Sequence, residues 1–177
     1  HLESLKAQAA VDNDNGLLDF SWWGDWCPPS GCHADRSHHN MAIVSSFMYL
    51  KQIRIMAKMS KRLGHKTDQA EYEALEKSVA AAFNAKFYNK TAATYYEYGR
   101  RKAEYLSPQT CIALAMDLGV IPADGLEAVM DTLVDDVMVK NNGHLNLGIV
   151  GVKYLLPALS RGGHVDVALQ VAQTEDQ

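Results

Sequence analysis

The chain has 177 residues, of which 47% are hydrophobic and 21% charged, and its formal net charge at pH 7 is −4. This is the composition of an ordinary soluble globular protein, and we expect residues 1–177 to form a single domain. The acidic balance gives no reason to expect a nucleic acid or an anionic membrane as a partner. No apolar run in the sequence approaches the ~18 residues of a membrane span.

The N-terminal segment is expected to be short, irregular and rich in tryptophan. All three tryptophans of the chain fall within Phe20-Ser21-Trp22-Trp23-Gly24-Asp25-Trp26-Cys27-Pro28-Pro29. Aromatic rings next to a carboxylate suit a sugar, because the rings cover the C–H face of a pyranose while the carboxylate accepts hydrogen bonds from hydroxyls. The alternative is that Trp22 and Trp26 anchor the segment to the core and Asp25 caps a helix or turn.

Cys27-x4-Cys32-His33 and His38-His39 follow and have residue types that bind zinc, although the spacing is loose. A loop disulfide between Cys27 and Cys32, or free thiols, is the alternative, and we expect no metal or other cofactor. Cys111 lies in a helical pattern and is expected to be a buried thiol.

Beyond residue 39, apolar periodicity predicts helices almost throughout. They come in pairs joined by short turns: 41–64 with 68–87, 108–119 with 124–141, and 147–161 with 164–175. Residues 88–105 are expected to form a loop with a short strand. The hairpins differ in length and share no consensus, which argues against a regular solenoid. The predicted fold class is all-α, with helical hairpins that form part of a larger helical toroid.

Several residues predict where these helices begin and end. Asp68 and Glu71 have the spacing of a capping box, and Ser107-Pro108 is an N-cap followed by a proline in the first helical position. Gly64, Gly119 and Asn142-Gly143 are expected to end three of the helices. The first helix is expected to bury the stripe Met41, Val44, Met48, Ile55, Met59 and Leu63, and the second Tyr72, Leu75, Val79, Phe83 and Phe87.

Few residues offer catalytic chemistry. Hydrolysis of a glycoside needs two carboxyl groups in one cleft, and Asp25 is the one acid in an aromatic setting. His144, in the polar turn 141–149, either faces a pocket or is a structural histidine, and Gly148-x-x-Gly151 indicates close packing. The remaining acids are expected to be surface or loop charges: Glu97, Glu104, Asp117, Asp131, Asp135 and Asp136.

Several segments together resemble bacterial-type α-L-rhamnosidases, glycoside hydrolase family 78. Asn15-Gly16-Leu17-Leu18 with Trp23-Gly24-Asp25-Trp26-x-Pro-Pro is similar to the Gly-Asp-Trp segment of their helical barrel. Three later segments resemble the family in the same order: Thr110-x4-Ala115-x2-Leu118-Gly119-x2-Pro122, Gly143-His144-Leu145-x2-Gly148-x2-Gly151 with Tyr154-Leu155-Leu156, and Leu159-x3-Gly163-x2-Asp166-x-Ala168. The resemblance covers almost the whole chain.

The resemblance implies a barrel of six helical hairpins and inverting hydrolysis of terminal α-linked L-rhamnose, by an acid and a base about 6.5–9.5 Å apart. It implies that these two carboxylates lie outside this chain, one upstream and one downstream. The chain would then be the middle of a catalytic domain, inactive by itself. Trp23, Asp25, Trp26 and His144 would contact the carbohydrate substrate.

Two other classes of function stay open from the sequence. One is a non-catalytic helical binding or interaction module that uses the tryptophan loop as a partner contact, and the other is a small zinc-stabilised helical domain. If part of the toroid is absent, an apolar face should be exposed, and the chain should self-associate or pair with the rest of the barrel.

Overall fold

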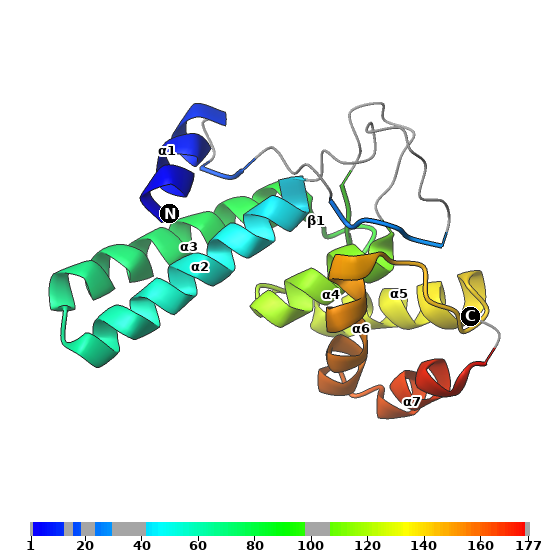
Figure 1. Ribbon diagram of the computed structural model, residues 1–177. Coiled ribbons are helices and arrows are strands. Elements are labelled where there is room, and N and C mark those ends of the chain that lie inside the picture. The colour runs from blue at the N-terminus through cyan, green and yellow to red at the C-terminus, as the bar shows by residue number, and fades with distance from the viewer. Residues whose placement is uncertain (1, 13–15, 19–23, 30–41, 98–106, 176–177) are drawn as a thin grey trace.

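The computed structural model describes residues 2–12, 16–18, 24–29, 42–97 and 107–175, and Figure 1 shows their arrangement. In these ranges the fold is built from helices, with one small β-hairpin between two of them. The elements are α1 (Leu2–Asp12), α2 (Ala42–Leu63), α3 (Lys66–Phe87), β1 (Tyr88–Asn89), β2 (Thr94–Tyr95), α4 (Pro108–Leu118), α5 (Leu126–Asp135), the π-helical turn η2 (Asp136–Lys140), α6 (Ile149–Arg161) and α7 (Val165–Gln173). The predicted all-α class is confirmed.

The helix boundaries follow local chemistry where a strong signal exists. The Ser107 hydroxyl accepts a hydrogen bond from the N–H of Gln109 (3.2 Å), and Gly119 ends α4 in the left-handed conformation (φ 59°), as predicted. The capping box at Asp68 and Glu71 is wrong. The helix α3 begins two residues earlier, at Lys66, because a tight turn through Gly64 and His65 joins it directly to α2.

The helices α2, α4 and α6 form an inner row, and each is followed by a partner helix: α3, α5 and α7 (Figure 1). The N-termini of the inner helices converge. Asp25 binds the first turns of both α4 and α6, and Glu97 binds the first turn of α2 while lying close to Cys111 in the first turn of α4. We call this the site end of the molecule.

The core is continuous from α1 to α7, but α2 buries a different face from the predicted one. Met48, Ile55, Met59 and Leu63 are 40–67% exposed. Val44 of the predicted stripe is buried, but the other apolar side chains that α2 buries include Ile43, Phe47, Leu50, Ile53 and Ala57. The prediction failed because α2 carries apolar residues on two faces, so the periodicity alone does not identify the face that packs. Met41 lies outside the described residues. The predicted inner face of α3 is confirmed: Val79, Phe83 and Phe87 are buried, and Tyr72 and Leu75 pack against the core.

The irregular N-terminal segment predicted for this chain begins with a helix instead. In α1, Leu2 and Ala9 are buried against the rest of the molecule. Residues 2–12 contain several strong helix formers and neither glycine nor proline, and this composition favours the helix that the prediction missed.

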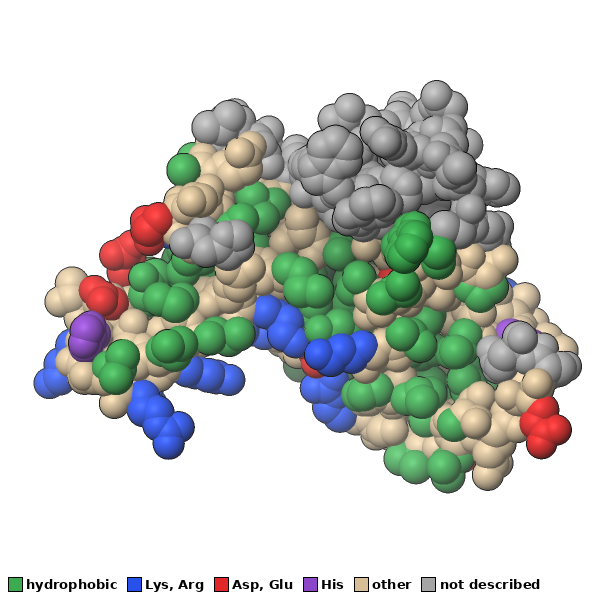
Figure 2. All heavy atoms as spheres, in the orientation of Figure 1, with side chains coloured by type: hydrophobic (Ala, Val, Ile, Leu, Met, Phe, Trp, Pro, Cys, Tyr) green, Lys and Arg blue, Asp and Glu red, His purple; other side chains and the backbone are tan. Residues whose placement is uncertain are grey.

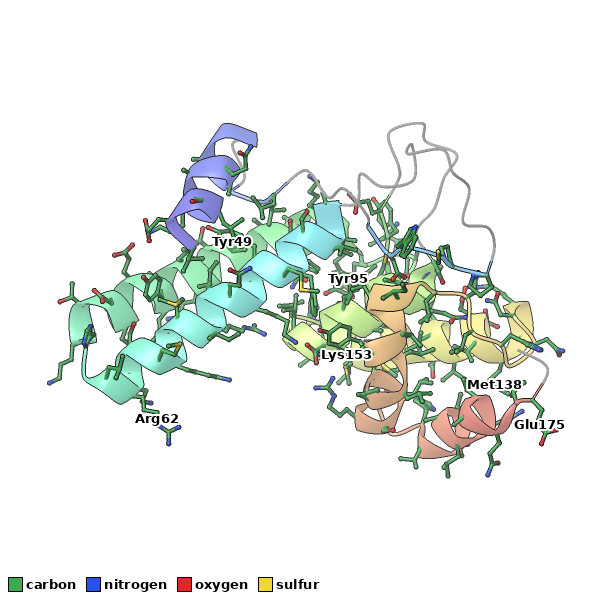
Figure 3. All side chains as sticks on the ribbon, in the orientation of Figure 1. Tyr49, Arg62, Tyr95, Met138, Lys153 and Glu175 are labelled. Carbon is green, nitrogen blue, oxygen red and sulfur yellow. The ribbon has the colours of Figure 1, made fainter. Side chains whose placement is uncertain are left out.

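The β-hairpin is the short strand expected within 88–105. Tyr88 lies opposite Tyr95, and the Tyr95 hydroxyl donates to Asn84 Oδ1 (2.6 Å). Figure 3 shows Tyr95 at the junction between the long α2–α3 hairpin and the remaining helices. Tyr95, which is 0% exposed, thereby anchors the start of the segment that brings Glu97 to the site end. Across the described ranges, no helix is both long and apolar enough to cross a membrane.

Candidate functional site

Asp25 accepts four hydrogen bonds at the site end. Although it is a carboxylate, it is only 5% exposed. Its Oδ1 accepts hydrogen bonds from the N–H groups of Val150 (2.9 Å) and Gly151 (2.8 Å). Its Oδ2 accepts from the N–H of Gly148 (2.7 Å) and from the Thr110 hydroxyl. One acidic residue therefore joins the segment 24–29 to the first turns of α4 and α6.

These four donors decide the role of Asp25. An ionised carboxylate offers about four lone-pair positions, and the chain itself occupies all of them. The first N–H groups of α6 have no acceptor within the helix, and its N-cap residue, Gly148, has no side chain that could accept from them. Asp25 supplies the acceptor from a distant segment. This geometry does not support the expected hydrogen bonds from Asp25 to sugar hydroxyls, and it favours the alternative of a helix cap.

The two glycines of Gly148-x-x-Gly151 pack against this carboxylate, as their spacing suggested. A side chain at position 148 would collide with the backbone carbonyl oxygens of Asp25 and Trp26. A Cβ at position 151 would lie 2.6 Å from Thr110 Oγ1 and 3.0 Å from Asp25 Oδ2. The absence of both side chains lets segment 24–29 approach the start of α6 closely. The N–H groups of Gly148, Val150 and Gly151 can then reach the Asp25 carboxylate.

Trp26 is held at its backbone, and much of the residue is exposed. Its carbonyl oxygen accepts a hydrogen bond from the N–H of Ile149 (2.8 Å), and 42% of the residue is accessible to solvent. The alternative in which Trp26 anchors the segment to the core therefore does not fit this residue. Beside it, Cys27 is exposed and adopts a left-handed backbone (φ 59°).

Several predicted features lie outside the described residues. These are Trp22 and Trp23, the partner of the proposed Cys27 disulfide, and most of the proposed zinc ligands (Cys32, His33, His38 and His39). Within the described part of the chain, no group of three or more His, Cys, Asp or Glu side chains is arranged to hold a metal ion.

His144 lies in the turn that leads into α6, four residues before Gly148. Its N–H donates to the carbonyl oxygen of Asn141 (2.9 Å), and its ring Nδ1 lies 3.0 Å from the same oxygen. A carbonyl oxygen can only accept, so Nδ1 carries the proton and Nε2 carries the lone pair when the ring is neutral. The half-buried His144 and the exposed Trp26 thus flank the beginning of one helix.

Two buried carboxylates were missed because the sequence suggested surface charges. Glu97 is 8% exposed and accepts hydrogen bonds from the N–H groups of Ala42 (2.8 Å) and Ile43 (2.7 Å), so it caps α2. Asp136 is 5% exposed and begins the π-helical turn η2. Glu97 had no local signal, because the N–H groups that it accepts from belong to α2, whereas Asp136 is bound by Asn141, five positions further along the chain. Asp131 and Asp135 are exposed as expected, and Glu104 lies outside the described residues.

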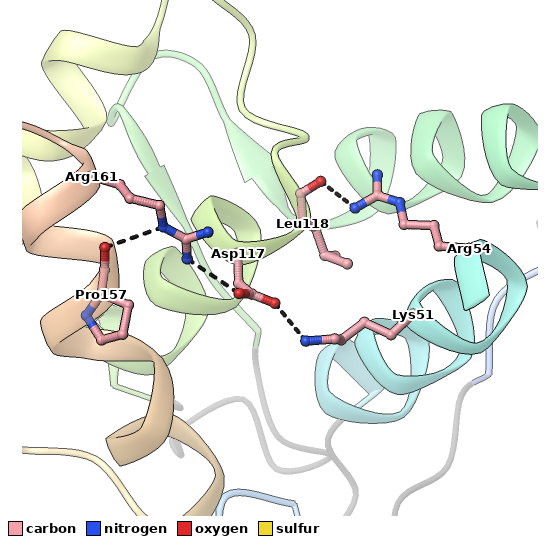
Figure 4. Close-up of polar contacts among 6 residues, drawn as sticks. All are labelled: Lys51, Arg54, Asp117, Leu118, Pro157 and Arg161. Carbon is pink, nitrogen blue, oxygen red and sulfur yellow. Dashed lines mark hydrogen bonds and ion pairs between the residues drawn. The ribbon is translucent and has the colours of Figure 1, made fainter. Parts of the chain in front are cut away.

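Asp117 joins the inner helices away from the site end, as Figure 4 shows. Its carboxylate binds Lys51 of α2 (2.7 Å) and Arg161 of α6 (3.2 Å), and Arg54 of α2 donates to the carbonyl oxygen of Leu118. Burial by itself would raise the pKa of Asp117, but the two cations outweigh it and hold the pKa below its ordinary value. Asp117 was also expected to be a simple surface charge, and its side chain is 19% exposed.

Cys111 confirms the prediction of a buried thiol. It is 0% exposed, and burial, followed by the nearby charges of Glu97 and Asp25, raises its pKa well above the ordinary value. The thiol therefore stays protonated and unreactive at neutral pH. At this end of the described chain, the acidic groups hold helices in place, while Trp26 and His144 are the predicted site residues that reach the surface.

Inner helices with converging N-termini, each followed by a partner helix, define a segment of a helical toroid. The family model of the bacterial alpha-L-rhamnosidase 6 hairpin glycosidase domain matches residues 3–177, and the chain belongs to this family. The described helices form three of its hairpins, α2–α3, α4–α5 and α6–α7, so the chain is a partial six-hairpin domain.

Individual relatives agree with this assignment. An alpha-L-rhamnosidase of Formosa agariphila is 29% identical over 169 residues, and one of Alteromonas sp. is 23% identical over 161 residues; these alignments cover 92% and 89% of this chain. The chain spans 17% and 16% of the length of these two relatives.

Solved structures show the same fold. The alpha-L-rhamnosidase from Dictyoglumus thermophilum matches 99% of this chain with a TM-score of 0.81 and 23% identity, and the match spans 19% of that protein. The Streptomyces avermitilis alpha-L-rhamnosidase complexed with L-rhamnose matches 98% of this chain with a TM-score of 0.70 and 23% identity, over 15% of that protein.

Proposed function

We propose that this chain forms part of the substrate-contacting wall of an inverting α-L-rhamnosidase catalytic domain. The observation that carries the proposal is the exposure of Trp26 on a backbone that Asp25 and Ile149 hold at the start of α6. An exposed tryptophan on a fixed backbone is suited to stack on the apolar face of a sugar, because less conformational entropy is lost when the sugar binds.

His144 supplies the polar part of the proposed contact. With Nδ1 directed at the Asn141 carbonyl, the neutral ring places its lone pair on Nε2 and can accept a hydrogen bond from a hydroxyl. Trp23 is proposed as a second stacking ring on the resemblance of the Gly-Asp-Trp segment alone. Asp25 is proposed to support Trp26 and is no longer assigned to the sugar.

The acid and base that hydrolysis requires are proposed to come from the rest of the catalytic domain. The buried carboxylates Asp25 and Glu97 are engaged in capping helices, so they are poorly suited to transfer protons. We expect the isolated 177-residue chain to bind sugar weakly and not to hydrolyse it.

The remaining hairpins are also the proposed partner of the exposed apolar surface. On α2, Met48, Ile55, Met59 and Leu63 are exposed, and Val165 and Leu169 of α7 are more than half exposed. Figure 2 shows apolar side chains gathered on both of these parts of the molecule. Because α2 and α7 are the first and last helices of the three hairpins, the next hairpins of a ring would cover such surfaces. Self-association is the alternative when those hairpins are missing.

The experiment is a titration of the chain with L-rhamnose, in which binding is measured by saturation-transfer NMR. Trp26→Ala should abolish the saturation transfer, whereas Leu169→Ala, which removes an exposed apolar side chain far from the site end, should leave it unchanged. Neither the wild-type chain nor the two variants should hydrolyse p-nitrophenyl α-L-rhamnoside. Equal binding by the Trp26→Ala variant, or hydrolysis by the isolated chain, would contradict the proposal.

A further inference from the structure

The helix α1 has the direction of a partner helix rather than that of an inner helix. Lys6 of α1 binds Glu71 near the start of α3 (Nζ–Oε1 2.6 Å). The segment after α1 leads to Leu18, whose carbonyl oxygen accepts a hydrogen bond from the Ser46 hydroxyl near the start of α2 (3.1 Å). The helix α1 therefore runs in the same general direction as α3, toward the site end, and it packs on α2 (Figure 1).

The other partner helices each follow an inner helix on which they pack: α3 follows α2, α5 follows α4, and α7 follows α6. The described residues contain no such inner helix for α1. Its place in the row is the side of α2 next to α1, because α4 packs on the other side. This place is a groove of about 360 Å³, lined by Leu2 and Glu3 of α1, Gln52, Ile55 and Met56 of α2, and Tyr72 of α3.

The stripe of α2 that borders the groove is apolar and exposed. Met48, Ile55, Met59 and Leu63 lie on one face of the helix, since their separations are close to whole helical turns, and they are 40–67% exposed. From the first to the last of them the stripe extends over roughly 22 Å at about 1.5 Å per residue. A neighbouring helix of about four turns would cover it.

The two edges of this stripe differ in charge. On the edge next to α1, the groove presents the carboxylate of Glu3. On the opposite edge, Lys58 and Arg62 are exposed and one turn apart, and Figure 2 shows Lys and Arg side chains below the apolar side chains of this hairpin. Within the described ranges neither of the two forms an ion pair, whereas Lys51, earlier on the same edge, binds an acid of α4.

We propose that this groove takes an inner helix of the remaining hairpins: an amphipathic helix of about four turns, apolar toward α2, with acidic residues along the edge that lies over Lys58 and Arg62 and no acid over Glu3. The apolar face supplies most of the affinity, whereas charges at its rim select the orientation and the partner. This assignment rests on the proposed function only in taking the remaining hairpins as the source of the helix.

The test selects helices by their charge pattern. A displayed library of amphipathic helices of about five turns, with leucine along one face and Glu, Lys or Gln allowed at each flanking position, is selected on the immobilised 177-residue chain. The wild type should enrich Glu along one edge, and the Lys58→Glu/Arg62→Glu variant should enrich Lys along that edge instead. Lys66→Glu/Lys77→Glu makes the same change of charge at exposed residues of α3, and it should select the same helices as the wild type.

Affinity measurements then locate the binding surface. The most enriched helix, labelled with fluorescein, should bind Ile55→Asp about tenfold more weakly than the wild type, because that variant places a charge in the apolar stripe. Ile55 is 52% exposed, so the fold should tolerate the change, and circular dichroism checks this. Leu169→Asp alters an equally exposed residue of α7 (57%) and should bind like the wild type. Helices with the same edge charges from the wild type and the charge-reversed variant, or unchanged binding by Ile55→Asp, would overturn the inference.

This test and the sugar titration fail independently. Selection of helices needs no sugar, and titration with L-rhamnose needs no helix. If the wild type binds no L-rhamnose, the proposed sugar contact fails, while the enriched charge pattern still decides what the groove takes. If L-rhamnose binds but the library yields no helix, or if sedimentation shows a dimer of the chain that Ile55→Asp disrupts, the inference fails and the sugar contact stands.

Discussion

Replacing Asp25 by asparagine would remove one of the two carboxylate oxygens that four donors share. The asparagine NH2 group is best tolerated in the position that Oδ2 occupies in the aspartate. There the Thr110 hydroxyl can turn and accept a hydrogen bond from it. The N–H of Gly148 has no such freedom and would be left buried against another donor. At least one backbone hydrogen bond is therefore lost even in the better orientation.

The cost can be estimated from these contacts. A buried donor left without an acceptor costs about 1–3 kcal/mol, and the loss of negative charge at the N-terminus of α6 adds about 0.3–1 kcal/mol. We expect Asp25→Asn to lower the free energy of unfolding by about 1.3–4 kcal/mol, a large part of the roughly 5–15 kcal/mol of a typical domain. The assay is equilibrium unfolding in urea, with an unchanged dependence on denaturant concentration as the check on two-state behaviour.

Asp166→Asn is the control for this estimate. Asp166 also lies in the first turn of a helix, α7, but it is exposed, so its replacement should cost no more than about 1 kcal/mol. If Asp25→Asn were no more destabilising than Asp166→Asn, the role of Asp25 as the acceptor that holds α4, α6 and the tryptophan segment together would be refuted.

Three further predictions concern stability and reactivity. Gly148→Ala should lower the thermal unfolding midpoint, at a cost of about 1–3 kcal/mol or more, since the added Cβ would collide with backbone carbonyl oxygens; a midpoint equal to the wild type would contradict this. Asp117→Asn should destabilise the chain by about 1–3 kcal/mol at pH 7. Because its pKa is lowered in the folded state, this contribution is present above the ordinary carboxyl pKa and disappears as the pH falls through the lowered value; urea unfolding at several pH values should therefore show the wild type and the variant converging in acid. Cys111, buried and with a raised pKa, should react with iodoacetamide only at the rate of unfolding, and mass spectrometry of the labelled peptide should show modification rising with urea.

The hairpins could be predicted from the sequence because their limits depend on nearby residues. Ser107 and Gly119 cap α4 through atoms within a few positions of themselves. The same reasoning failed at Asp68, where the tight turn between α2 and α3 starts the helix before the expected cap. It also failed for the buried face of α2, since two apolar faces compete and only the position of the neighbouring helices decides between them.

The roles of the site residues depend on contacts that no local pattern reveals. Asp25 accepts from donors 85, 123, 125 and 126 positions away, and Glu97 caps a helix that begins 55 positions earlier. An acid next to tryptophan suggests a sugar-binding residue. The sequence does not show that the carboxylate oxygens of this acid already accept hydrogen bonds from the chain itself. The resemblance to a known family supplied the fold, but it did not distinguish a residue that touches substrate from one that supports it.

The two networks at the site end share one support. Gln109 and Thr110 are consecutive residues in the first turn of α4, and both are 0% exposed. Gln109 binds the backbone at His144 and Asn146, while Thr110 binds Asp25, which holds Gly148 to Gly151. The loop between η2 and α6 is thus fixed by side chains that bind its backbone: Gln109 at His144 and Asn146, and Asp25 from Gly148 to Gly151. Because these bonds reach the backbone of the loop, we expect side chains that face outward from it to vary at little cost to its geometry.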